Sequence, residues 1–384
     1  MEFTTSETVA AFAAEVRQFL AEHLTTEARE QMHRTGTVHD WALHRAIAAR
    51  GWVAAAIPGA SAARDPFEMA VLFRELELAD APYHGLATTM IVAGVLDQAG
   101  SEALKAKVLP EILAGDAIAS LGYSEPDHGS DVAAASTRAV PNDGGSSWTI
   151  NGQKMWTTLA HVAQHVLLLT RTDPDVPKHR GLSMFLVPLD TAGISVQAVP
   201  TMASERTNVT FYDDVVVSDD CRVGDINGGW RVMAIALGLE RGVMGGTAMG
   251  EVLWHQARAW AESAGMIDRG PVREALARTR IDNEISWLLT QRTAWIANTG
   301  GSPSIEGSMA KLFSSQAYQR AARRFQDLAG AGGLLAMGTP GAVADGAIER
   351  SARHAAVTTI QGGTTEIQRN NIAERHLGLP SSRR

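Results

Sequence analysis

Apolar residues at the start of the chain recur at steps of three and four positions. Val9, Phe12, Val16, Phe19 and Leu20 follow this spacing, which places them on one face of a helix. Alanine-rich patterns with the same period continue to about residue 115. The first third of the chain is therefore predicted to be helical.

After residue 116 the pattern changes to short apolar and β-branched runs between turn residues, which is typical of strands. The expected strands cover residues 148–150, 165–170, 182–187, 194–199 and 208–217. From about Gly229 long helical patterns return, and one helix face is expected to carry Met309, Leu312, Phe313, Ala317, Ala321 and Phe325. The order predicts a multidomain α+β fold with helical residues 1–116, a β domain at 117–226 and helical residues 227–384.

Composition supports a globular protein of more than one domain. The chain has 384 residues, 45% of them hydrophobic and 20% charged, whereas one domain usually takes roughly 100–200 residues. The net charge of −8, with no basic run, argues against a nucleic-acid partner. The single cysteine, Cys221, cannot form an internal disulfide or a cysteine metal site. With no leader-like start and no long apolar run, a cytoplasmic protein is expected.

A segment rich in hydroxyls, acids and glycines covers residues 121–131, after a predicted strand. Its backbone N–H groups and the hydroxyls of Ser124 and Ser130 could bind a polar ring edge or a phosphate. Turn formation alone favours the same residue types. The segment is thus compatible with a ligand loop and with an ordinary turn.

A second segment begins at Asn151-Gly152, a pair that favours a tight hairpin. We therefore expect a returning strand that carries Trp156 and Thr158. A flat aromatic side chain beside a hydroxyl suits a planar heteroaromatic cofactor. A tryptophan packed in the β core would give the same spacing.

A third segment, residues 361–368, holds a glycine pair and a threonine pair before a helical pattern. Backbone N–H groups at such a helix start can bind anions or carbonyl oxygens. An ordinary helix cap explains the same residues.

Together these segments, in this order and spacing, resemble the acyl-CoA dehydrogenase family. The resemblance covers nearly the whole chain and includes residues 1–20, 171–174, 211–215 and 361–379. It implies a middle β-barrel-like domain, a C-terminal helical bundle and FAD as cofactor. It also implies an enzyme that removes two hydrogens beside a coenzyme A thioester and passes electrons to an electron-transferring flavoprotein.

By this resemblance, Ser124, Ser130, Trp156 and Thr158 hold the edge of the flavin ring. They match family positions in the loop and in the segment after Asn151-Gly152.

Three further positions are implied to lie near the cofactor. Thr364 and Glu366 match family positions in the last helical segment, although glutamine is common where Glu366 stands. Gly330 begins a glycine-rich stretch that in the family reaches the cofactor of a neighbouring subunit. An oligomer is therefore expected, either a homotetramer or homodimer or a hetero-oligomer.

The catalytic base is the position where the resemblance needs most care. Removing a proton α to a thioester requires a carboxylate in a dry pocket beside the flavin, and many relatives place it where this chain has Gly362. A smaller group carries it on a helix just before an arginine, a pattern that Glu240-Arg241 matches. The resemblance thus implies Glu240 as base, Arg241 as a positioning residue and the Gly362 N–H as a donor to the thioester oxygen. Without the family, Glu240 reads as a surface carboxylate and Arg241 as a structural ion-pair partner.

The chain departs from the family in two respects. The Arg-x-x-Phe-Gly element that meets the FAD pyrophosphate of another subunit is missing, and Arg269 is the candidate replacement. The missing side chain at Gly362 leaves room for a branched, cyclic or bulky acyl group. An acyl-CoA oxidase, a flavin monooxygenase and a non-catalytic partner subunit stay open as alternatives.

Overall fold

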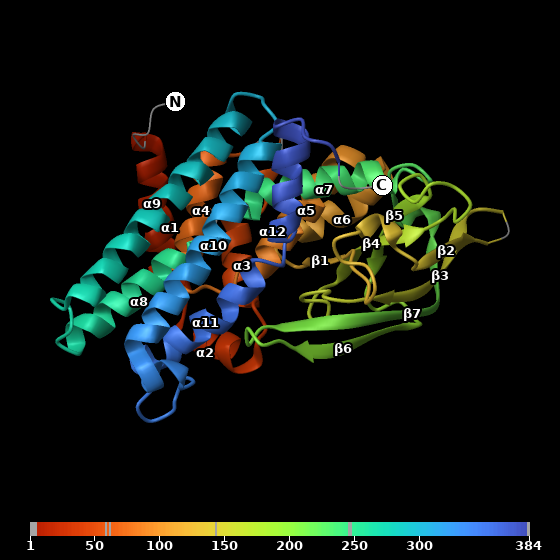
Figure 1. Cartoon of the computed structure of the whole chain (residues 1–384). Helices are drawn as coiled ribbons and strands as arrows, with labels where there is room; N and C mark the ends of the chain where they lie inside the picture. The colour runs from red at the N-terminus through yellow and green to blue at the C-terminus, as the bar shows by residue number, and fades with distance from the viewer. Residues whose placement is uncertain (1–5, 58–59, 61–62, 143, 245–247, 382–384) are drawn as a thin grey trace.

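The computed structural model describes residues 6–57, 60, 63–142, 144–244 and 248–381. Figure 1 shows a large helical body joined to one sheet, with β6 and β7 projecting along the sheet's lower edge. None of the helices in these ranges is both long and apolar enough to cross a membrane.

The N-terminal part is helical, as predicted. Phe12, Val16, Phe19 and Leu20 are all at most 5% exposed and pack on one face of the first helix. Ser6 caps this helix by accepting a hydrogen bond from the N–H of Val9. The helices are α1 (Glu7–His23), α2 (Thr26–Thr35), α3 (Trp41–Ala49), α4 (Pro66–Leu78), α5 (His84–Ala99) and α6 (Glu102–Ala114).

The middle part is a sheet with the order β6-β7-β3-β2-β4-β5-β8, and β1 pairs with β4 in parallel. All five expected strands are confirmed. The strands are β1 (Ala119–Gly122), β2 (Arg138–Pro141), β3 (Ser147–Lys154), β4 (His165–Arg171), β5 (Leu182–Pro188), β6 (Ile194–Pro200), β7 (Arg206–Ser218) and β8 (Arg222–Val223).

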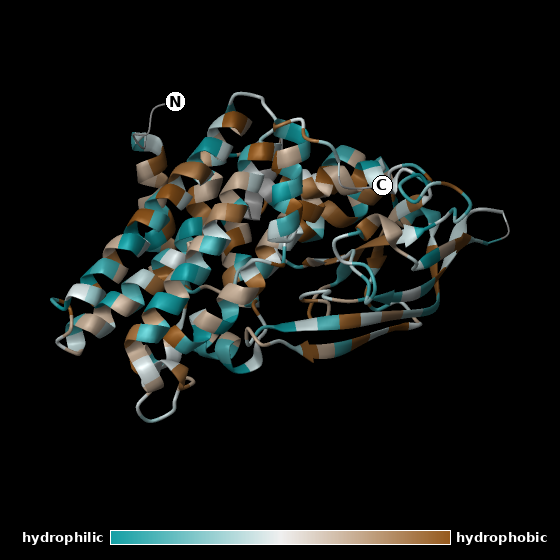
Figure 2. Cartoon of the chain, viewed as in Figure 1, coloured by the Kyte–Doolittle hydropathy of each residue, from teal (hydrophilic) through white to brown (hydrophobic). Residues whose placement is uncertain are grey.

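The continuous apolar run of β4 reflects burial on both of its faces. Leu167 and Leu169 join the core that the helices form, whereas Val166 and Leu168 join the core of the β domain. Because side chains alternate along a strand, each face packs on a different layer. In Figure 2 the hydrophobic colours are dense around α5, where the helices meet the sheet.

The hairpin predicted at Asn151-Gly152 is wrong. Both residues lie inside β3, which continues along β7 with a register shift between Ile150 and Gly152. Gly152 has φ +145°, and a Cβ there would lie 2.7 Å from the Cα of Thr137. The pair therefore forms a bulge, a structure that glycine also favours, and Trp156 and Thr158 follow the strand in a loop instead of lying on a returning strand.

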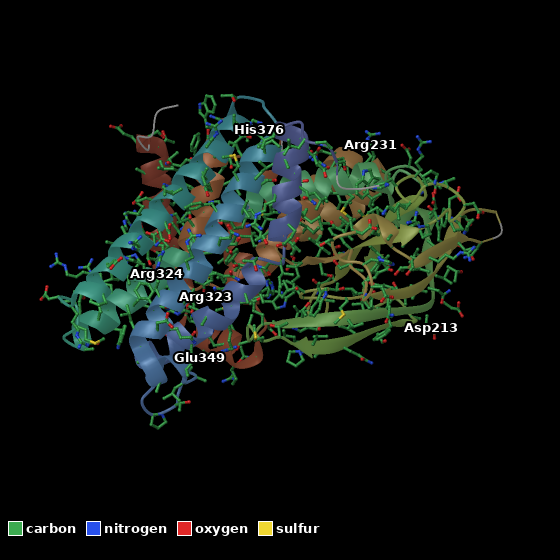
Figure 3. The ribbon with its side chains drawn as sticks, viewed as in Figure 1. Asp213, Arg231, Arg323, Arg324, Glu349 and His376 are labelled. Atoms are coloured by element: carbon green, nitrogen blue, oxygen red, sulfur yellow. The ribbon has the colours of Figure 1, made fainter. Side chains whose placement is uncertain are left out.

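The C-terminal part is again helical. Its helices are α7 (Gly229–Met244), α8 (Met249–Ser263), α9 (Gly270–Asn298), α10 (Ser304–Ala329), α11 (Ala347–Thr358) and α12 (Thr365–Asn371), followed by a π-helical turn (Ile372–His376). On α10, Ala317, Ala321 and Phe325 are buried as predicted, but Met309 is 36% exposed. Arg324 of α10, labelled in Figure 3, pairs with Asp282 of α9 and links these neighbouring helices.

The turn between β6 and β7 reaches back to the helices. The N–H of Arg206 donates to the carbonyl of Gly36, which caps α2, and Arg353 of α11 donates to the carbonyl of Met202. These contacts bring Glu205, in the same turn, against the helical layer.

Candidate active site

A cavity of about 270 Å³ collects four of the residues predicted from the sequence. Trp156, Thr158, Glu240 and Gly362 all line it. They come from the loop after β3, from α7 and from the turn between α11 and α12. Residues far apart in the chain thus meet around one space.

The carboxylate of Glu240 lies beside the backbone of Gly362. A Cβ built on Gly362 would lie 3.3 Å from Glu240 Oε1 and 3.6 Å from the Cε of Lys311. Gly362 also has φ +63°, which side-chain-bearing residues rarely adopt. The glycine therefore leaves open the space beside which the carboxylate stands.

Lys311 and Tyr123 are neighbours of Glu240 that the sequence analysis missed. The Lys311 ammonium donates to the carbonyl of Thr358, and burial lowers the pKa of Lys311 to about 8 although Glu240 opposes this change. Burial, and secondarily Glu240, raises the pKa of Tyr123 well above its usual range. Tyr123 belongs to the 121–131 segment and could have been found there, whereas no motif marks Lys311.

The loop after β1 is held in place by a buried ion pair. Lys154 Nζ lies 2.8 Å from Glu125 Oε1, and Glu125 accepts further hydrogen bonds from Ser136 and Thr137. Burial alone raises the pKa of Glu125, but Lys154 and these hydrogen bonds lower it to about 2. The carbonyl of Ser124 accepts from the N–H of Met155 at 2.9 Å. The ion pair thus fixes this loop against the segment that carries Trp156.

Trp156 does not pack in the β core, so that alternative is wrong. Its side chain is 53% exposed and its φ is +64°, an uncommon backbone conformation for tryptophan. The N–H of Thr157 donates to the carbonyl of Asn208, and Thr158 Oγ1 lies 3.1 Å from Thr207 Oγ1. Held by these bonds, Trp156 presents a large apolar face to the cavity, and such strained residues concentrate at functional sites.

Other predicted residues lie outside the cavity lining. Ser130, Gly330 and Glu366 are exposed, and Gly330 ends α10 with φ +59°. Thr364 accepts a hydrogen bond from the N–H of Ile367 and so caps α12. This is the ordinary helix cap that the sequence analysis gave as the alternative to a binding role.

The sequence analysis also named two arginines, Arg269 and Arg241. Arg269 is exposed at the start of α9, where it contacts Met266. The backbone of Arg241 continues α7, but its side chain lies outside the described residues.

The cavity residues fit a planar cofactor with a polar edge. Trp156 supplies a flat apolar face and Thr158 a hydroxyl. Gln368, which also lines the cavity, donates to the carbonyl of Gly362 at 3.0 Å, while its Oε1 is buried without a hydrogen-bond partner among the described residues. The hydroxyl of Tyr123 is also buried and has no hydrogen-bond partner among the residues that the structure describes. Unpaired buried polar atoms are costly unless a ligand or water satisfies them.

Models of the acyl-CoA dehydrogenase family match three successive parts of the chain. The N-terminal domain model matches residues 6–116, the middle domain model residues 120–215 and the C-terminal domain model residues 227–377. Together these matches cover nearly the whole sequence.

Individual relatives agree with the family models. Acyl-CoA dehydrogenase FadE26 of Mycobacterium tuberculosis is 34% identical over 391 aligned positions, which cover 96% of each chain. The Tcur3481-Tcur3483 steroid ACAD has 30% identity and a TM-score of 0.87, with complete coverage of both chains. The ChsE4-ChsE5 complex from Mycobacterium tuberculosis has 31% identity and a TM-score of 0.87, also with complete coverage.

Proposed function

Since the chain belongs to the acyl-CoA dehydrogenase family, and is therefore an oxidoreductase, we propose that it converts an acyl-CoA thioester to the 2-enoyl-CoA with FAD. The observation that carries this proposal is the position of Glu240, whose Oε1 lies 3.3 Å from the Cβ site of Gly362 in the cavity shared with Trp156. A carboxylate there can remove the α-proton of a thioester seated against Gly362.

Two groups beside Glu240 would support this proton transfer. Lys311 places a positive charge near the carboxylate, which favours its ionised form. Within the described residues the N–H of Gly362 donates no hydrogen bond, so it is available to the thioester oxygen, where negative charge develops.

The fit of the cavity residues supports FAD as the cofactor. Trp156 and Thr158 would hold its ring. Ser124 is not part of the cavity lining, but its carbonyl is bonded to Met155 beside Trp156, so it would lie near the ring edge. When bound, FAD supplies an acceptor for the β-hydrogen as hydride. Ser130, Gly330, Thr364 and Glu366 would take their family roles only in an assembly with FAD present.

The acyl group is proposed to be bulky. Gly362 leaves space near the reacting carbons, and one relative is named a steroid ACAD. A ring-bearing acyl group is consistent with both observations.

We further propose that the chain works in an assembly and passes electrons to an electron-transferring flavoprotein. Two relatives are named as pairs of chains. On α9, Ile281, Ile285, Leu288 and Trp295 are each at least 36% exposed, and such an apolar stripe suits a subunit contact. Co-expression with a candidate partner chain, followed by measurement of the mass of the purified assembly, distinguishes a second copy of this chain from a different partner.

The test of the proposed base is Glu240→Gln. We expect FAD to remain bound while reduction of the flavin by acyl-CoA, followed anaerobically, slows by about 10²- to 10⁴-fold, because the amide cannot accept the proton. The matched control is Glu262→Gln on α8, an exposed carboxylate paired with Arg258.

Near-normal flavin reduction in Glu240→Gln would remove Glu240 from the mechanism. If none of the acyl-CoAs reduces the flavin of the parent protein, even with its partner chain present, the chain is instead a non-catalytic subunit. Fast reoxidation of the reduced flavin by dioxygen would favour an oxidase or a monooxygenase over a dehydrogenase.

A further inference from the structure

The candidate active-site cavity adjoins a second cavity of about 240 Å³. The two cavities share a set of mostly polar lining residues, which therefore stand between them. Met249 is the apolar member of this shared set. We call its polar members the polar wall: Glu77, Tyr83, His84, Glu205 and His354.

The polar wall lies away from the reacting end of the cavity. Thr358 and His354 both line the cavity from α11, and four residues of helix separate them by about 6 Å. Thr358 accepts a hydrogen bond from Lys311, which is adjacent to Gly362. A group that reaches His354 in the polar wall thus lies about one helical turn from the end of the cavity where a thioester would sit against Gly362.

Two carboxylates give the polar wall its character. The hydroxyl of Tyr83 donates to Glu77 Oε1 at 2.9 Å, and Tyr83 and Glu77 are only 7% and 8% exposed. Glu205 Oε1 lies 3.2 Å from His354 Nε2. Burying such groups is unfavourable unless they are hydrogen-bonded. A hydrocarbon end would displace water from the polar wall without replacing its hydrogen bonds.

His84 is the member of the polar wall best placed to contact a ligand. Its backbone N–H donates to the carbonyl of Val38 at 3.0 Å, and its ring stands edge-on to Tyr83 with centroids 5.1 Å apart. Within the described residues its imidazole makes no hydrogen bond to protein. Burial lowers the pKa of His84, and a neutral imidazole offers one donor and one acceptor.

The charges around the polar wall disfavour an anionic ligand group. Glu77 and Glu205 are joined by Asp80 in the second cavity. Glu349 also lines that cavity, and both of its arginines are already paired, Arg350 with Asp80 at 3.6 Å and Arg353 with Glu349 at 2.5 Å. A carboxylate on the substrate would meet excess negative charge, whereas a hydroxyl or a ketone would not.

We propose that the acyl group of the substrate carries a neutral oxygen function, a hydroxyl or a ketone, remote from the thioester, and that His84 and the polar wall bind it. This inference rests on the proposed function of the same cavity. It assigns the polar wall to substrate selection and not to the chemical step.

The test uses the FAD-loaded protein, with its partner chain if one is needed, and three CoA thioesters on one ring-bearing skeleton. One has a ring hydroxyl, one is unsubstituted and one has a ring carboxylate. We expect kcat/KM for anaerobic flavin reduction to be about 10- to 100-fold higher for the hydroxyl compound than for either of the others.

Variants then locate the selection. His84→Phe should bring the ratio of hydroxyl to unsubstituted compound towards one, whereas His84→Gln, which keeps a donor and an acceptor, should preserve most of it. His255→Phe, on the exposed side of α8, is the matched control. Thermal unfolding confirms that each variant is folded.

Three results overturn the proposal. The first is that kcat/KM for the unsubstituted or the carboxylate compound equals that for the hydroxyl compound. The second is that His84→Phe leaves the ratio unchanged, and the third is that only acyl-CoAs without a remote oxygen reduce the flavin. In each of these cases the proposed dehydrogenation stands. Failure of every acyl-CoA to reduce the flavin would overturn both proposals together.

Discussion

A single missing side chain decides how the candidate base can be supplied. Gly362 combines a positive φ with close approach of Glu240, so two physical reasons disfavour a larger residue there. The sequence predicted Glu240, Gly362, Trp156 and Thr158 by resemblance, and the cavity contains all four. Lys311 could not be predicted as a neighbour of Glu240, because only the packing of α10 against α7 brings it there.

Gly362→Ala should impair the reaction more than the fold. The added Cβ would crowd Glu240 Oε1 at 3.3 Å and shift the carboxylate, so we expect flavin reduction to slow by roughly 10- to 100-fold. The backbone strain at φ +63° should lower the free energy of unfolding by about 1 kcal/mol.

Gly265→Ala separates these two effects. Gly265 has φ +65° but nothing within 4 Å of its Cβ site, so it should show the strain without the loss of rate. Equal rates for the two variants would contradict the proposed contact between residues 362 and 240.

At the level of elements, the sequence predicted strands better than connections. The apolar runs of β4 and β5 were clear because both faces of these strands are buried. Asn151-Gly152 was misinterpreted because glycine with positive φ serves a hairpin and a bulge equally, and the pairing with β7 decides between them. The ion pair of Glu125 with Lys154 joins β3 to the loop after β1 and was not predicted, because nothing local marks a buried lysine.

Lys154→Met should destabilise the protein strongly. Lys154 is 0% exposed, and removing it leaves the Glu125 carboxylate buried without its cation, at a cost of about 3–5 kcal/mol in the free energy of unfolding. Denaturant unfolding measures this change, and FAD retention reports on the loop that Glu125 holds.

Lys178→Met is the comparison for this variant. Lys178 forms a 2.6 Å ion pair with Asp131 on the surface, and its loss should cost less than about 1 kcal/mol. The combined Lys154→Met and Glu125→Gln variant should recover part of the lost stability. A small effect of Lys154→Met would mean that water reaches Glu125.

For the whole molecule, buried histidines set a limit on acid stability. His39 and His44 lie with ring centroids 5.1 Å apart, and none of their nitrogens has a hydrogen-bond partner among the described residues. Burial, with smaller effects of neighbouring positive groups, lowers the pKa of His39 to about 3 and that of His44 to about 4. The folded protein thus keeps both rings neutral at a pH where the unfolded chain protonates them.

Stability should therefore fall as the pH drops from about 6.5 towards 4. Since the unfolded state binds up to two more protons in this range, the free energy of unfolding should decrease by at most about 2.7 kcal/mol per pH unit from this pair. The ionised Glu125 also stabilises the fold. Because its pKa in the folded protein is about 2, this stabilisation is lost completely only at a pH below the range in which the histidines act.

Urea unfolding at several pH values between 7.5 and 4.5 measures this slope. A variant with His39→Gln and His44→Gln should show a shallower dependence than the parent protein, with His161 and His84 accounting for what is left. An unchanged slope would show that the pair does not control the acid transition.

The closeness of Glu240 to the backbone at 362 also restricts how such a site can evolve. Two chain positions, 362 itself and 240 on α7, could supply the base that we propose at this point of the pocket. A side chain gained at 362 would crowd the glutamate already on α7, and under the proposed mechanism loss of the α7 glutamate alone would remove the base. Under the proposed mechanism either order of change passes through a less active enzyme, so a lineage that has adopted one arrangement is expected to keep it.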